Sequence, residues 1–102
     1  MELDLKEIRK NLDTIDDQMI ALFRERMQLS AQVAAYKKEN NMPILDSGRE
    51  SQIIERLSQA AGVEFASATR QLYQTIFQLS RAYQAELIQA VKEPRENDED
   101  ET

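Results

Sequence analysis

Apolar residues recur along the first third of the chain with the alternating three- and four-residue spacing of one helix face. No proline or glycine interrupts residues 5–40, and Asp4 stands where a helix N-cap is expected. The pattern predicts a first helix over residues 5–40, which would be ~54 Å long. A compact chain of this length has a radius of gyration of only ~13 Å, so we expect this helix to pack against a second chain. The positions on this face are Leu5, Ile8, Leu12, Ile15, Met19, Leu22, Arg26, Leu29, Val33 and Tyr36.

Two further helical segments follow the break made by residues 40–43, which end in Pro43. One helix is predicted over residues 47–61, with Gly62 as its stop. Another is predicted over residues 65–92, with an apolar stripe and a proline after its end. No internal repeat or strand pattern is present, so the predicted fold class is all-α, with three helices per chain in an intertwined, domain-swapped homodimer. The stripe consists of Leu72, Ile76, Leu79, Tyr83 and Leu87, with Tyr73 and Phe77 beside it.

The composition narrows the classes of function. The chain has 102 residues and a net charge of −6, which favours one soluble domain and disfavours nucleic-acid binding. It contains neither cysteine nor histidine, which excludes disulfides, thiolate or imidazole catalysis and the usual zinc sites. No apolar run resembles a signal peptide or a membrane span, so a cytoplasmic protein is expected. We expect a helical domain over residues 1–92 and a disordered acidic tail over residues 93–102.

Arg26 interrupts an otherwise apolar helix face. It could set the register of a coiled coil, or its stem could carry the guanidinium out to water. Alternatively, because an unpaired buried charge is costly, an anionic ligand could meet it inside the bundle. Lys37 lies eleven residues later on nearly the same face, ~16 Å along the axis. It could join the same ligand site or be an ordinary exposed lysine.

Two polar clusters stand on the later segments. Asp46, Arg49 and Glu50 occupy one face of a helical turn, either as a surface salt-bridge cluster or as a clamp in which Glu50 accepts a hydroxyl. Ser80 and Gln84 lie one turn apart beside the apolar stripe, either as boundary positions or as groups that orient a ligand.

Taken together, these positions resemble the all-helical (AroQ-type) chorismate mutases, and the resemblance covers residues 5–87. The matching pieces read IRKNLDTIDDQMIALFRERMQLSAQVAAYK, PILDSGRE and SRAYQ. The resemblance implies the Claisen rearrangement of chorismate to prephenate, without cofactor or metal, in a homodimer whose two sites combine residues of both chains. The positions that match the family pattern are Arg9, Arg26, Lys37, Asp46, Arg49, Glu50, Ser80 and Gln84.

The resemblance also implies roles for these residues. Arg26 and Arg9 of the partner chain would hold carboxylates, for which the planar guanidinium is suited. Lys37 and Gln84 would donate to the ether oxygen, where negative charge develops.

Four further roles follow from the same pattern. Glu50 would accept the ring hydroxyl, helped by the backbone near Asp46. Ser80 would assist a carboxylate, and Arg49 would support the acidic turn. The candidates for apolar walls are Val33, Ile53 and Phe77.

Two alternative functions stay open at this point. Isochorismate-pyruvate lyases are similar to these mutases and share most of the cationic groups, so product identification is needed to separate the two activities. A non-catalytic helical dimerisation module would tolerate Arg26→Leu or gain stability from it, whereas an enzyme would stay folded and lose activity.

Overall fold

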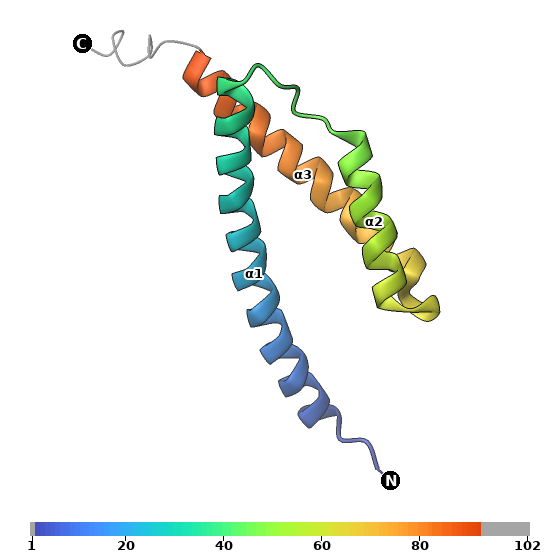
Figure 1. The fold of residues 1–102 in the computed structure, drawn as a ribbon. Helices are drawn as coiled ribbons and strands as arrows, with labels where there is room; N and C mark the ends of the chain where they lie inside the picture. The colour runs from blue at the N-terminus through green and yellow to red at the C-terminus, as the bar shows by residue number, and fades with distance from the viewer. Residues whose placement is uncertain (1, 93–102) are drawn as a thin grey trace, which may run out of the picture.

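The computed structural model describes residues 2–92 and is helical apart from short connections (Figure 1). Helix α1 spans Leu5–Glu39, α2 spans Ser47–Ala61, a short 3-10 helix η1 spans Val63–Phe65, and α3 spans Ala66–Lys92. No strand occurs in this part of the chain. The predicted all-α fold with three helices is therefore confirmed. The η1 turn was not predicted, and the predicted acidic tail over residues 93–102 lies outside the described residues.

Both ends of α1 follow from local hydrogen bonding. The Asp4 carboxylate accepts a hydrogen bond from the backbone N–H of Lys6 at 3.0 Å and caps the first turn. At the other end, the N–H of Met42 donates to the carbonyl of Lys37 at 2.8 Å, and the N–H of Asn41 donates to that of Lys38 at 3.3 Å. Asn41 has a φ of 54°, which asparagine tolerates better than most residues. This pairing is a Schellman motif, and it turns the chain sharply out of α1.

Asp46 and Gly62 delimit α2. The Asp46 carboxylate accepts a hydrogen bond from the backbone N–H of Arg49 at 3.0 Å, so it is the N-cap. Gly62 has φ 88° and ψ 163°, a backbone conformation open essentially only to glycine. The chain leaves α2 through this residue and enters η1 and then α3.

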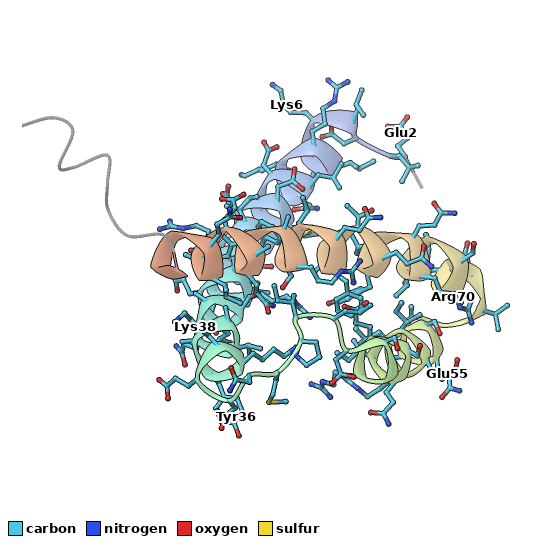
Figure 2. The ribbon with its side chains drawn as sticks, turned by 90° about the horizontal axis from the view of Figure 1, so that it is seen from above. Glu2, Lys6, Tyr36, Lys38, Glu55 and Arg70 are labelled. Atoms are coloured by element: carbon cyan, nitrogen blue, oxygen red, sulfur yellow. The ribbon has the colours of Figure 1, made fainter. Side chains whose placement is uncertain are left out.

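The helices α1 and α2 each pack against α3 and not against each other. Only the C-terminal half of α1 packs against α3, and the N-terminal half of α1 extends well beyond the other helices (Figure 1). Glu2 and Lys6 lie at this projecting end (Figure 2). The radius of gyration is accordingly 18.9 Å, against the ~13 Å of a compact chain of this size. The prediction that α1 exceeds its own domain is confirmed.

Few apolar side chains are buried within this chain. In the described part they are Ala34, Ile53 and Phe77. Apolar residues on the projecting half of α1 stay about half exposed, with Leu12 at 51% and Met19 at 52%. The homodimer stays a prediction, and these side chains are the surface it would have to cover.

The predicted apolar stripe of α3 is only partly covered within this chain. Leu72 and Leu79 are 47% and 48% exposed, whereas Phe77, Ser80 and Gln84 are buried. The face that meets α1 and α2 is thus displaced around the helix from the most apolar positions, because the neighbouring helices contact α3 on one side only. Polar residues consequently lie at the centre of the three-helix packing.

Length and hydropathy together rule out a membrane span for every helix within the described residues.

Substituting the two glycines by alanine should have different effects on stability. Gly62→Ala should lower the free energy of unfolding by about 1–3 kcal/mol, because alanine is strained at a φ of 88°. Gly48→Ala is the matched control: it lies in the first turn of α2, and an added Cβ would lie at an ordinary 3.7 Å from the Asp46 carboxylate. It should be neutral or raise stability by about 0.5 kcal/mol. Urea unfolding at one fixed protein concentration measures both, and equal effects would contradict the assigned role of Gly62.

Candidate functional site

A cavity of about 370 Å³ lies where α1, the connection over residues 40–46, α2 and α3 meet. This volume is in the range of small-molecule sites. Seven of the eight residues singled out in the sequence line it, together with all three predicted apolar walls, Val33, Ile53 and Phe77. Elements from three separate parts of the chain thus converge on one space. The seven are Arg26, Lys37, Asp46, Arg49, Glu50, Ser80 and Gln84.

Arg9 is the one predicted site residue that does not line the cavity. It is exposed on the projecting half of α1, seventeen residues before Arg26. That spacing corresponds to ~25 Å along a helix. Within one chain, Arg9 therefore cannot reach a small ligand that Arg26 contacts.

The cavity carries more positive than negative charge. Its lining includes four cationic side chains, Arg26, Lys37, Arg49 and Arg81, and two carboxylates. The surplus of two positive charges in a concave space favours a ligand with two negative charges.

Aromatic rings support the Arg26 guanidinium. Its central carbon lies 5.7 Å from the ring centroid of Tyr73 and 5.5 Å from that of Phe77, which is cation–π distance. The two rings meet edge to face, 5.8 Å apart. Arg26 forms no salt bridge within residues 2–92. A stacked guanidinium still offers in-plane N–H donors, so Arg26 is positioned to receive a planar anion such as a carboxylate.

Lys37 connects the end of α1 to the loop that follows. Its ammonium donates a hydrogen bond to the backbone carbonyl of Ile44 at 2.7 Å, while its own carbonyl closes the Schellman motif. The side chain is half-buried and lines the cavity. Because an ammonium has three donors, two remain for a ligand. The interpretation of Lys37 as an ordinary exposed lysine is therefore wrong.

Ser30, Ser80 and Gln84 form a buried polar cluster between α1 and α3. The two serine hydroxyls share a hydrogen bond, and the Gln84 amide nitrogen donates to Ser30 at 2.8 Å and to Ser80 at 3.2 Å. The amide oxygen of Gln84 is buried and has no hydrogen-bond partner. All three residues are less than 10% exposed, so the interpretation of Ser80 and Gln84 as boundary positions is wrong.

Ser30 was not identified from the sequence. It lies one turn after Arg26, and this i, i+4 spacing puts the two on one helix face. From this spacing, Ser30 could have been predicted to face the same ligand as Arg26.

Glu50 forms an ion pair with Arg81, and both residues line the cavity. One terminal guanidinium nitrogen of Arg81 lies 2.6 Å from both carboxylate oxygens of Glu50. The pair joins α2 to α3, and the side chains are 31% exposed for Arg81 and 22% for Glu50. The family resemblance gave Arg49 the role of supporting the acidic turn, and the ion-pair partner of Glu50 in the structure is Arg81. These residues are thirty-one positions apart, so no local spacing could have indicated the pair.

This arrangement suits binding and orientation of a small dianion. Cationic donors lie on α1, α2 and α3, a carboxylate with unused lone pairs lies beside them, and apolar walls restrict the space between. Donors of this kind can also stabilise negative charge that develops during a reaction.

Comparison with known proteins gives one family and several relatives. The family model described as chorismate mutase type II matches residues 8–85. A chorismate mutase of Methanocaldococcus jannaschii is 42% identical over 53 residues, which are 52% of this chain and 54% of that protein. A 4-amino-4-deoxychorismate mutase of Streptomyces venezuelae is 29% identical over 58 residues, which are 57% of this chain and 56% of that protein. The matches thus span about half the length of each of these two relatives.

A solved structure shares the fold. It is a conserved hypothetical protein of Pyrococcus furiosus, 31% identical in sequence, with a TM-score of 0.68. The match covers 82% of this chain and 99% of that one.

Proposed function

The chain belongs to the chorismate mutase type II family, and we propose that it catalyses the rearrangement of chorismate to prephenate. One observation carries the proposal: seven residues expected from the sequence surround a single cavity whose lining has two surplus positive charges. Chorismate is a flexible dianion with two carboxylates, one ring hydroxyl and an ether oxygen. Each of these groups has a complementary side chain among the lining residues or on the projecting half of α1.

The reaction requires positioning and electrostatics. One C–O bond breaks while one C–C bond forms, so no nucleophile and no obligatory proton transfer is needed. Holding the substrate in the chair conformation that reacts moves the entropic cost of ordering it from the reaction step to the binding step. Donors aimed at the ether oxygen stabilise the charge that grows there. The lack of histidine and cysteine is no obstacle to this chemistry.

In this proposal Arg26 binds one substrate carboxylate while its guanidinium rests on Tyr73 and Phe77. Lys37 has donors beyond the one directed at Ile44, and it directs one of these at the ether oxygen. Ser80 on α3 helps to bind a carboxylate of the substrate. Arg9 of the partner subunit completes the set.

Gln84 serves as the second donor to the ether oxygen. In the structure its amide nitrogen faces two serine hydroxyls and its amide oxygen is unpartnered. A half-turn of the amide lets the oxygen accept a hydrogen bond from the Ser30–Ser80 pair, because hydroxyls can donate as well as accept. The nitrogen then needs an acceptor, and in this proposal the ether oxygen of the substrate supplies it.

The functional unit in this proposal is a homodimer with shared sites. The projecting half of α1 exposes a row of apolar side chains that no element of the same chain covers within the described residues. It also carries Arg9, which is ~25 Å from Arg26 along the helix. Antiparallel packing of two α1 helices would cover the apolar row and bring each Arg9 to the other chain's cavity.

Purified protein should convert chorismate to prephenate, as identified by liquid chromatography of the product. With isochorismate it should release little or no pyruvate. Pyruvate formation from isochorismate as the main activity would favour the lyase alternative. Turnover of neither substrate by a folded dimer would contradict the enzymatic proposal and favour the dimerisation module.

Lys37→Ala should lower kcat by ~10²–10³-fold with a smaller change in KM, because its charge matters most when the ether oxygen becomes anionic. Lys38→Ala is the matched control. Lys38 is the next residue, and it lies exposed on the side of α1 away from α2 (Figure 2). Steady-state kinetics should show wild-type values for the control. A raised KM with unchanged kcat in Lys37→Ala would show that Lys37 contributes to binding alone.

Arg9→Ala and Arg26→Ala should each be nearly inactive as pure homodimers yet restore activity when mixed. In a hybrid dimer, one site combines the intact Arg26 of one chain with the intact Arg9 of the other, and the second site lacks both. Random pairing of equal amounts makes about half of the dimers hybrid, so about a quarter of wild-type activity should return.

The measurement is prephenate formation after the two variants are unfolded together and refolded. Each variant refolded alone is the control. Hybrid dimers that form and stay inactive would show that Arg9 does not complete the neighbouring site.

A further inference from the structure

We propose that Arg81 sets the substrate preference of this cavity, by making it accept a neutral hydroxyl and reject an ammonium at the position that Glu50 contacts. This inference rests on the proposed function, because it concerns the ring substituent of the same substrate. It adds a specificity-determining residue that the sequence patterns did not identify.

The geometry of the Glu50–Arg81 pair carries the inference. The same nitrogen of Arg81 lies 2.6 Å from each oxygen of Glu50, so the carboxylate faces a single, closely held cation. Both side chains line the cavity and are less than one third exposed. The negative charge of Glu50 is therefore already compensated before any ligand binds.

Glu50 also has capacity left for a ligand. It differs from Asp46, the other acidic residue of the cavity lining, because its carboxylate is paired with a cation, whereas the Asp46 carboxylate accepts a backbone N–H as the N-cap of α2. A carboxylate offers about four lone-pair sites, and Arg81 occupies one site on each oxygen of Glu50. A ring hydroxyl can donate to a remaining site without disturbing the ion pair.

An ammonium at the same place would meet a different environment. Two cations that share one carboxylate at ordinary hydrogen-bond distances lie about 5 Å apart. Their repulsion is substantial in a half-buried site, and Arg49 and Lys37 add further positive charge to the same cavity. A hydroxyl carries no charge and avoids this repulsion. The pair thus discriminates between substrates that differ only in this substituent.

The pair of test substrates is chorismate and 4-amino-4-deoxychorismate, in which an ammonium replaces the ring hydroxyl. The measured quantity is the ratio of kcat/KM for chorismate to kcat/KM for the amino compound, at neutral pH. Wild-type protein should favour chorismate. Removing the positive charge in Arg81→Gln should lower this ratio about tenfold, since repulsion is lost and Glu50 becomes available to pair with the ammonium.

Three companion variants sharpen the experiment. Arg81→Lys keeps the charge, and its ratio should stay within about threefold of wild type. Arg70→Gln is the matched control, because Arg70 is an exposed arginine near the start of α3, away from the cavity (Figure 2), and should leave the ratio unchanged. Arg81→Met removes the charge with an unbranched apolar side chain and replaces Arg81→Gln if that variant does not fold, as judged by circular dichroism.

The ratio separates a specificity role from a structural one. Loosening of the contact between α2 and α3 would lower turnover of both substrates together and leave the ratio near its wild-type value. Such a result, with wild-type protein active on chorismate, would overturn the role of Arg81 and leave the proposed function intact. A wild-type preference for the amino compound would also overturn it. Wild-type protein that converts neither substrate would overturn the proposed function, and this inference with it.

Discussion

A single uninterrupted helix of 35 residues constrains everything else in this molecule. A chain of this size cannot wrap such a helix along its whole length, so α3 covers the C-terminal half and the N-terminal half projects. The cavity forms beside the covered half, where the chain turns back through the loop and α2. The same geometry separates Arg9 from Arg26 and makes a second chain necessary if both are to contact one ligand. The length of α1 thereby links the shape of the subunit to the composition of its site.

The packed centre of the subunit is unusually polar. Ser30, Ser80 and Gln84 are buried where α1 meets α3, and a guanidinium rests on aromatic rings beside them. Apolar residues of similar volume at such positions are often neutral or stabilising. Polar residues at these positions are explained if a dianionic substrate binds there, since the ligand then supplies the negative charge and the hydrogen-bond acceptors that the protein lacks. In that case the partners of these buried polar groups come partly from the protein and partly from the substrate.

Much of the fold was readable from the sequence because its signals are local. Asp4 is the N-cap it was expected to be, and Gly62 ends α2 as predicted. Helical spacing placed the polar residues of each cluster on one face, but it left an ordinary interpretation open for each, and the family resemblance was what joined them into one site. The sequence located the apolar stripe of α3 but not the residues that this chain itself buries: Leu72 and Leu79 stay half exposed, because the position of the neighbouring helices decides which face is covered. The partner of Glu50 could not be inferred either, because it depends on how α2 crosses α3.

The small number of buried apolar side chains has a consequence for how the protein behaves at different concentrations. If the proposed homodimer forms, a subunit with so little interior of its own draws much of its stability from association, and folding and assembly become one equilibrium. Dilution would then act as a denaturant, and the melting temperature would rise with the amount of protein present. If each site also needs an arginine from the second chain, catalytic competence follows the same mass-action law. The cellular concentration of such a protein would then determine the activity of each molecule as well as the number of molecules.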